Sequence, residues 1–252
     1  CVVNPTGIAV ITQDGYKKVI GGTGDQDPGK RPEFGDAYAE EPVYNEIVTA
    51  GDYVFTVGDW SSDYATGIRS DVKADDWIWW GNEARNETNF ILKTLNARLE
   101  NAGTSLANAV HCTVFLVDLG DLYEVDLVWK KFFPKDPPAR TVIPIRGLGT
   151  PRAEGPSTHA EGAMKMESMF QSVRLSDATA REVITTGSPV LGHESEAVRA
   201  GHLLWTSAIL AGNESGLVTR SDIQSQLSYL FARLRDICEA GGTSLDNLLR
   251  LR

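Results

Sequence analysis

Apolar residues along the middle of the chain alternate between strand-like runs and helical spacing. Helices are predicted at residues 83–102 and 121–133, where apolar residues recur three or four positions apart. Short apolar and β-branched runs bounded by turn residues predict strands at residues 53–58, 108–119, 140–144 and 162–172. The order strand, helix, strand, helix, strand, strand predicts an α+β fold, in which two helices pack on one face of a mixed sheet.

Two stretches of this pattern recur later in the chain, in the same order. Residues 50–56 (AGDYVFT) return as residues 200–206 (AGHLLWT), and residues 100–108 (ENAGTSLAN) return as residues 239–247 (EAGGTSLDN). Collinear self-similarity of this kind indicates duplicated units. We therefore expect a first unit with an N-terminal extension at residues 1–172 and a partial second unit at residues 173–252, beginning with a strand at 182–187.

The second unit contains no counterpart of the second helix or of the strand run that begins at Arg140. Half of such a unit exposes apolar sheet surface and an open strand edge, which invites pairing. Its complement is expected from residues outside this sequence or from a second polypeptide.

Composition excludes several classes of function. The 252 residues are 42% hydrophobic and carry a net charge of −10 without any basic run, which argues against nucleic-acid binding. No apolar run approaches 18 residues, so no membrane span is expected. The three cysteines Cys1, Cys112 and Cys238 are far apart and form no CxxC pair, which argues against a disulfide framework and a zinc site. These features predict a cytoplasmic protein without a metal.

Arg140 is the first candidate for chemistry. Pro137 and Pro138 fix an extended approach, because proline sets its own φ and restricts the residue before it. A guanidinium at the start of a strand offers a planar fork that holds a carboxylate by two parallel hydrogen bonds. The alternative is a surface arginine at a strand end.

Cys1 is a second candidate, because an N-terminal cysteine can act as a nucleophile with its own α-amino group as the base. An amide or ring-opening hydrolase would follow if Cys1 lay beside Arg140. A chain boundary without chemical meaning is the alternative.

Four ordered segments carry a resemblance to a known family: GTSL at 103–106, TVFLVD at 113–118, VWKKFFP at 128–134 and PPART at 137–141. The chain resembles the YjgF/RidA family of reactive-intermediate deaminases over residues 43–172, and partially over residues 180–252. The resemblance implies a chorismate-mutase-like fold that assembles as a trimer, with active sites in the clefts between neighbouring units. It also implies hydrolysis of enamines and imines to 2-oxo acids and ammonia without metal or organic cofactor.

The resemblance further implies roles for individual residues. Arg140 matches the carboxylate-binding arginine, Tyr44 the tyrosine before the first core strand, and Gly58 the glycine whose backbone donates to the substrate. Asp126 stands where the family often has asparagine, and is expected to contact the substrate.

This sequence departs from the family at three positions. Val57 stands in place of a serine, and Val142 in place of a cysteine. Lys165 replaces the glutamate credited with water activation, while Glu167 keeps the second of two alternating glutamates on the same face of the strand. Arg140, Tyr44 and Glu167 are the expected catalytic residues, and Gly58, Asp126 and Lys165 the expected substrate-binding ones. Glu161 or an acid from a neighbouring unit is the alternative to Glu167 as the replacement for the missing glutamate.

Three functions remain open. The first is a hydrolase that deaminates a small carboxylate-bearing enamine, imine or related C–N compound held by Arg140. The second is a binding or scaffold protein that holds a small carboxylate without turnover, which the Lys165 departure favours. The third is the amidohydrolase that uses Cys1. In each case we expect a homo-oligomer, a trimer or a pseudo-hexameric ring, and no nucleic-acid or membrane partner.

Overall fold

A mixed six-stranded sheet forms the centre of the molecule in the computed structural model, which describes residues 17–20, 46–63, 67–68, 72, 82–148, 166–173, 180–213, 216–217 and 222–251. The strand order is β1–β2–β3–β8–β6–β7, in which β6 and β7 are parallel and the other neighbours antiparallel. The bounds are β1 Lys17–Ile20, β2 Ile47–Ala50, β3 Tyr53–Thr56, β6 Ala109–Leu116, β7 Ala139–Pro144 and β8 Met166–Val173.

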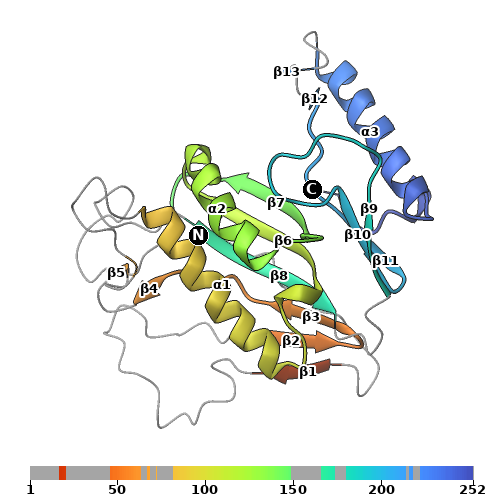
Figure 1. Ribbon diagram of the computed structural model, residues 1–252. Coiled ribbons are helices and arrows are strands. Elements are labelled where there is room, and N and C mark those ends of the chain that lie inside the picture. The colour runs from red at the N-terminus through yellow and green to blue at the C-terminus, as the bar shows by residue number, and fades with distance from the viewer. Residues whose placement is uncertain are drawn as a thin grey trace, which may run out of the picture.

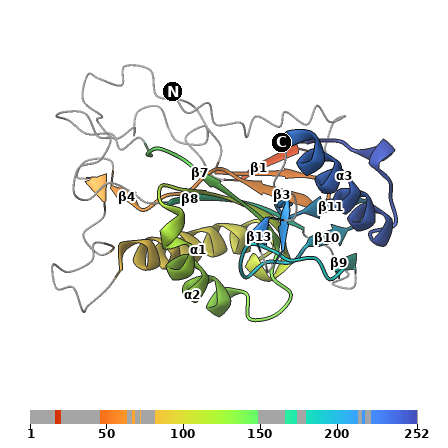
Figure 2. The same cartoon turned by 90° about the horizontal axis from the view of Figure 1, so that it is seen from above.

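Two helices, α1 (Glu83–Asn101) and α2 (Leu122–Phe132), cover one face of this sheet, as Figures 1 and 2 show from two directions. The Asn82 side chain caps α1 by accepting a hydrogen bond from the Arg85 backbone N–H, which satisfies one of the free donors at a helix start. Gly103 follows α1 with φ +79°, the left-handed conformation in which helices commonly end. Both predicted helices and the α+β fold class are confirmed.

The main core lies between these helices and the sheet. It contains apolar residues of α1 spaced as the sequence predicted, together with residues of α2 and of the helix-facing side of the strands; fully buried members include Ile91, Leu92, Leu95, Leu99, Val125, Trp129, Cys112, Val114, Met166 and Phe170. Each large apolar side chain removed from water contributes roughly 1.5–3 kcal/mol before entropy is subtracted. This core fixes the positions of β6, β7 and β8, on which the candidate residues lie.

Strand alternation divides the candidate residues between the two sheet faces. Cys112 is in register with Arg140 and with Phe170, a core residue, so Arg140 lies on the helix-covered face. Phe115 is in register with Glu167. Because Phe115 is an odd number of residues from Cys112 along β6, the side chains of Phe115 and Glu167 lie on the opposite face of the sheet.

The C-terminal part of the chain adds a three-stranded antiparallel sheet, in the order β11–β10–β9, and one long helix, α3. Their bounds are β9 Arg181–Ile184, β10 Ala197–Ala200, β11 Leu203–Thr206 and α3 Ile223–Ala240. The recurring stretches form turns of the same conformation. Gly51 and Gly201 both have φ +58°, and Gly103 and Gly242 have φ +79° and +77°.

The C-terminal sheet packs against the N-terminal sheet on the side away from α1 and α2. The contact is an apolar cluster that joins β6 and β7 to β10, made by Val110, Ala139, Val198 and Ala200. Tyr53 completes it by donating a hydrogen bond from its hydroxyl to the Ala200 carbonyl at 3.1 Å. Residues far apart in the sequence therefore lie side by side at this junction (Figure 1).

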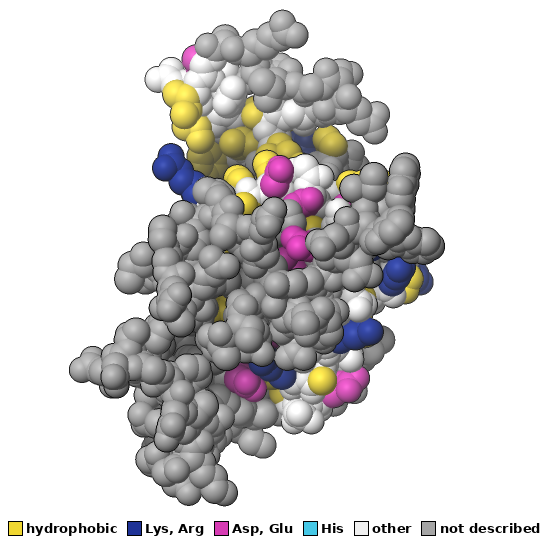
Figure 3. All heavy atoms as spheres, turned by 90° about the vertical axis from the view of Figure 1, so that its left-hand side faces the viewer, with side chains coloured by type: hydrophobic (Ala, Val, Ile, Leu, Met, Phe, Trp, Pro, Cys, Tyr) yellow, Lys and Arg dark blue, Asp and Glu magenta, His cyan; other side chains and the backbone are white. Residues whose placement is uncertain are grey.

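One face of α3 differs from its counterpart on α1, because it exposes apolar side chains. Ile223 is 72% exposed, and Leu227 and Phe231 are 45% and 41% exposed, whereas Ile91, Leu92, Leu95 and Leu99 of α1 are completely buried. Figure 3 shows hydrophobic side chains gathered in the upper part of the view, at the height of α3 in Figure 1. The apolar exposure expected of a partial unit is present among the described residues, and what covers it stays a prediction.

Several strand boundaries differ from the predicted ones. The strand predicted at 53–58 ends at Thr56, and the one predicted at 182–187 ends at Ile184. Strand β2 was not predicted, because its four residues IVTA bury the polar Thr49 and leave the apolar Val48 half-buried, so they show no simple alternation of apolar and polar residues. Very short pairs also occur, β4 Ser62–Asp63 with β5 Gly67–Ile68 and β12 Gly212–Asn213 with β13 Gly216–Leu217.

Candidate functional site

Arg140 is completely buried where the two parts of the chain meet. It is the second residue of β7, and its side chain lies between the sheet and α2 with 0% exposure. The guanidinium carbon is 4.9 Å from the centre of the Trp129 ring, within the range of a cation–π contact. A charge this deeply buried needs anionic partners, since desolvation alone is very costly.

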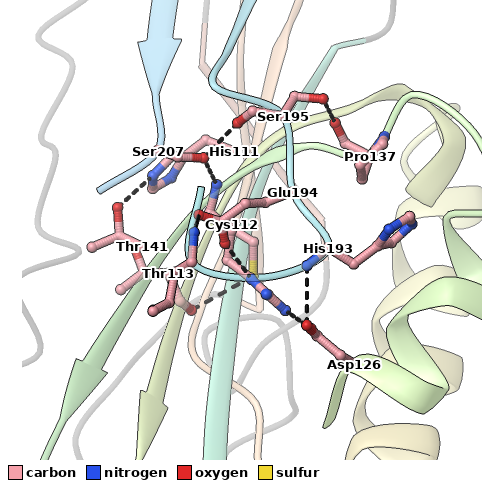
Figure 4. A network of polar contacts seen from close by, with 12 residues as sticks. His111, Cys112, Thr113, Asp126, Pro137, Thr141, His193, Glu194, Ser195 and Ser207 are labelled. Atoms are coloured by element: carbon pink, nitrogen blue, oxygen red, sulfur yellow. Dashed lines mark hydrogen bonds and ion pairs between the residues drawn. The ribbon is translucent and has the colours of Figure 1, made fainter. Parts of the chain in front are cut away.

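Two carboxylates supply that compensation from opposite sides. Nη1 of Arg140 donates to Oδ1 of Asp126 on α2 at 2.7 Å, and Nε donates to Oε2 of Glu194 at 2.9 Å. Figure 4 shows Asp126 approaching from the helix and Glu194 from the loop before β10. Burial alone would lower the pKa of Arg140, but the charges of Glu194 and Asp126 outweigh it and raise the pKa. Arg140 is therefore held in its charged form.

The residues directly before and after Glu194 bind the N-terminal part of the chain. The His193 backbone N–H donates to Oδ2 of Asp126 at 3.0 Å, and the Ser195 hydroxyl donates to the Pro137 carbonyl at 2.5 Å. Ser207, just after β11, accepts a hydrogen bond from the Arg140 backbone N–H at 2.7 Å and donates to the Ser195 carbonyl at 2.6 Å. We name the contact of loop 191–196 and Ser207 with Arg140 the Arg140 junction (Figure 4).

The Arg140 junction changes the expectation for Arg140 in one respect. The sequence predicted an arginine in a groove between units, free to bind a small acid; the arginine does lie between the two parts, but Glu194 already holds its Nε. The alternative of a surface arginine is wrong, because the side chain is fully buried. Asp126 binds Arg140 and the His193 backbone, and its expected contact with substrate stays a prediction.

A second group of polar residues lies on the other side of the sheet. Glu167 is 7% exposed on β8, and burial, with a further contribution from the negative charge of Asp59, raises its pKa to about 7. Asp59 itself pairs with Arg98 of α1 at 3.1 Å. Gly58 lies against the Glu167 carboxylate so closely that a Cβ at this position would overlap Oε1. We name Gly58, Asp59 and Glu167 the Glu167 site.

The structure thus brings the predicted residues together in two pairs. Arg140 with Asp126 forms one, Gly58 with Glu167 the other, and the two pairs lie on opposite faces of the same sheet. Within one chain, the sheet therefore lies between the side chains of Arg140 and Glu167.

Other predicted residues lie outside the described residues: Tyr44, Lys165 and Cys1. Cys112 and Cys238 are both free and buried, so each acts as a small residue of the packed interior. No group of three or more His, Cys, Asp or Glu side chains in the described part of the chain is placed to hold a metal ion. None of the helices that can be described is both long and apolar enough to cross a membrane.

Two residues of the Arg140 junction, Glu194 and Ser207, were not predicted. A signal for both exists in the recurring stretches, because continuing the match of Ala50 with Ala200 pairs Tyr44 with Glu194 and Val57 with Ser207. Ser207 therefore places a serine at a position where Val57 lacks one.

Replacing Gly58 with alanine tests the packing of the Glu167 site. The added methyl group must displace the Glu167 carboxylate, and overpacking of this kind costs about 1–3 kcal/mol of unfolding free energy. Urea unfolding of Gly58→Ala measures the loss. The same substitution in a Glu167→Ala background is expected to cost less than about 0.5 kcal/mol, and an equal cost in both backgrounds would show that the collision with Glu167 is not the cause.

Comparison with known proteins places the N-terminal part in a family. The family model described as endoribonuclease L-PSP matches residues 35–154. The RutC family protein y4sK of Sinorhizobium fredii is 31% identical over 113 residues, which cover 45% of this chain and 82% of that protein. The 3-aminoacrylate deaminase RutC of Acinetobacter baylyi is 32% identical over 90 residues, covering 36% of this chain and 70% of that protein.

Among solved structures, RidA from an Antarctic Psychrobacter is 20% identical and aligns over 54% of this chain and 91% of that one, with a TM-score of 0.40. The sequence comparisons alone carry the assignment. With a relative above 30% identity matched over four fifths of its length, this chain belongs to the endoribonuclease L-PSP, or YjgF/RidA, family.

Proposed function

We propose that this chain hydrolyses the C–N bond of a small carboxylate-bearing imine or enamine, with Glu167 as the group that transfers protons. The observation that carries the proposal is the Glu167 carboxyl group, which is buried, has a pKa raised to about 7, and lies against the backbone of Gly58. A relative named as a 3-aminoacrylate deaminase supports the reaction class.

The chemistry requires little beyond proton transfer and a positioned water molecule. Hydrolysis of an imine adds water across the C=N bond and releases ammonia, leaving a C=O group. The nitrogen of the C=NH group must gain two protons and the attacking water must give up both of its own, so one group with a pKa near the working pH can serve in both directions. Glu167 meets this requirement in place of the family glutamate that Lys165 replaces.

The substrate carboxylate needs a cation, but Arg98, the cation next to the Glu167 site, is already paired with Asp59 and Glu46. At the Arg140 junction, the Ala208 backbone N–H donates to the Arg140 carbonyl at 3.1 Å, directly after the contact with Ser207. The recurring stretches pair Ala208 with Gly58. We therefore place Gly58 and Glu167 opposite the arginine of a neighbouring unit, in a cleft of the same design.

This arrangement agrees with an assembly of units in a ring, a trimer or a pseudo-hexamer, built from a unit at residues 1–172 and a partial unit at 173–252. The division is supported by the matching turns at Gly51 and Gly201 and by the separate C-terminal sheet. No organic cofactor is needed for the reaction.

Substitution of Glu167 by glutamine tests the proposal. The imine is generated continuously from serine by a separate dehydratase, and the rate of its conversion to pyruvate and ammonia is measured with and without this protein. We expect the wild-type chain to accelerate the conversion and Glu167→Gln to lose that acceleration, while the exposed variant Glu182→Gln keeps it. Full acceleration by Glu167→Gln would refute the role of Glu167.

One observation favours a second function, that of a scaffold protein without turnover. Arg140, the residue expected to bind the substrate, holds the Glu194 carboxylate of its own chain. If the wild-type protein accelerates no imine hydrolysis in the assay above, this second function is the better account.

A further inference from the structure

The contact of Arg140 with Glu194 has the geometry of a bound ligand. Both side chains are 0% exposed, and the Nε–Oε2 distance is 2.9 Å, as expected of a charge-assisted hydrogen bond. Glu194 comes from a segment 54 residues away in the sequence and enters as a single carboxylate between β7 and α2.

Loop 191–196 is shaped to deliver this carboxylate. Gly192 lies so close to the guanidinium that an added Cβ would be 2.6 Å from Arg140 Nη2, so no larger residue fits there. The Leu191 backbone N–H donates to Glu194 Oε1 at 3.3 Å and orients the second carboxylate oxygen. Arg140 Nη2 itself has no hydrogen-bond partner among the described residues, although it is buried.

The unpaired Nη2 indicates that Glu194 occupies the position next to Arg140 without using all of the hydrogen-bond donors of the guanidinium. A guanidinium presents Nε and Nη2 side by side, and a free carboxylate binds both in a bidentate manner. Glu194 engages Nε, and Nη2 lies next to Gly192.

We infer that Glu194 is a built-in occupant of a carboxylate site at Arg140, which excludes small external carboxylates and fastens the C-terminal sheet to the N-terminal one. The ligand class that fits the emptied site is a small monocarboxylate of the size of acetate or pyruvate. The inference concerns the Arg140 junction alone and does not depend on the chemistry of Glu167.

Truncation of Glu194 to alanine, followed by rescue with acetate, tests this inference. The truncation leaves Asp126 as the remaining anionic partner of the buried guanidinium and removes the hydrogen bond of Nε, so the melting temperature of Glu194→Ala is expected to fall by roughly 10 °C. Acetate at up to about 100 mM is expected to recover at least about half of that loss in a saturable manner, because a ligand that binds only the folded state stabilises it.

Three controls separate a bound carboxylate from a general salt effect. Sodium chloride at matched ionic strength and acetamide, the neutral analogue of acetate, are expected to give no recovery. Glu194→Gln keeps the volume of the side chain and so should not respond to acetate. The wild-type protein should not respond to acetate either, since its own carboxylate fills the site.

Equal responses of Glu194→Ala to acetate and acetamide, or of the wild type and Glu194→Ala to acetate, would overturn the inference. If Glu194→Ala does not fold in chloride, it is refolded from urea in acetate or acetamide. Recovery of folded protein in acetate alone supports the inference, and recovery in neither or in both refutes it. The acetate rescue measures the stability of the protein and not imine hydrolysis, so failure of the function proposed for Glu167 does not change the outcome of the rescue.

Discussion

Arg140→Met is expected to lower the free energy of unfolding by about 3–5 kcal/mol, the largest effect of any single substitution considered for this chain. Methionine approximates the length of the side chain but removes the charge, so the carboxylates of Glu194 and Asp126 lose their common partner. Glu194 then remains buried with only the weak donor of the Leu191 backbone. Urea unfolding, followed by tryptophan fluorescence, measures the loss.

A matched arginine in an exposed pair provides the control. Arg85 binds Glu124 at 2.5 Å, but its side chain is 44% exposed, and exposed ion pairs contribute about 0–1 kcal/mol. Arg85→Met should therefore cost less than about 1 kcal/mol. In addition, Arg140→Met combined with Glu194→Met should be more stable than Arg140→Met alone, because replacing both members of a buried pair removes the unpaired charge. Equal losses at Arg85 and Arg140 would contradict this account.

The ion pair of Arg140 with Glu194 was not predictable from the sequence, and the packing at the Arg140 junction explains why. Local patterns predicted α1 and α2 well, because the spacing of residues such as Ile91, Leu95 and Leu99 repeats within a single element. Glu194 lies in the polar sequence HESE, which has the composition of a solvated loop. Its burial follows from the packing of two sheets against each other, and no periodicity within either segment encodes that contact.

At the Glu167 site, in contrast, the sequence did predict which residues come together. The alternation of β8 placed Glu167 on the sheet face opposite Met166 and Phe170, and its neighbour Gly58 was singled out by the resemblance to a family. The raised pKa of Glu167 was not predictable, because it results from burial and from Asp59, which the turn after β3 brings close. The sequence thus indicated that Gly58 and Glu167 come together, whereas the pKa of Glu167 depends on how deeply its side chain is buried.

The separation of Arg140 and Glu167 onto opposite faces supports the proposed assembly of units. Under the proposed mechanism, a unit that presents Arg140 on one face and Glu167 on the other needs a neighbouring unit to complete the site. The Arg140 junction is completed within this chain, and there Glu194 stands at the position that pairs with Tyr44. The proposed catalytic cleft is a junction in which that position carries no competing carboxylate.

Glu167→Gln is expected to stabilise the protein above neutral pH and to leave its stability nearly unchanged in mild acid. The pKa of Glu167 is raised to about 7 in the folded protein, against an ordinary value near 4.5, so folding favours the protonated form. The stability that this group contributes is complete below about pH 4.5 and is lost as the pH rises through 7. Two to three pKa units correspond to a loss on the order of 3 kcal/mol at pH 8.

Glutamine cannot ionise, so its variant avoids this loss. The difference in unfolding free energy between Glu167→Gln and the wild type should therefore be small at about pH 5 and should grow towards about 3 kcal/mol at about pH 8. Urea midpoints measured across this range give the difference, and Glu182→Gln, at a carboxylate that is 52% exposed, should differ from the wild type by less than about 0.5 kcal/mol throughout. A Glu167→Gln difference that does not change with pH would show that Glu167 is charged in the folded state over the whole range, which removes the basis for its role in proton transfer.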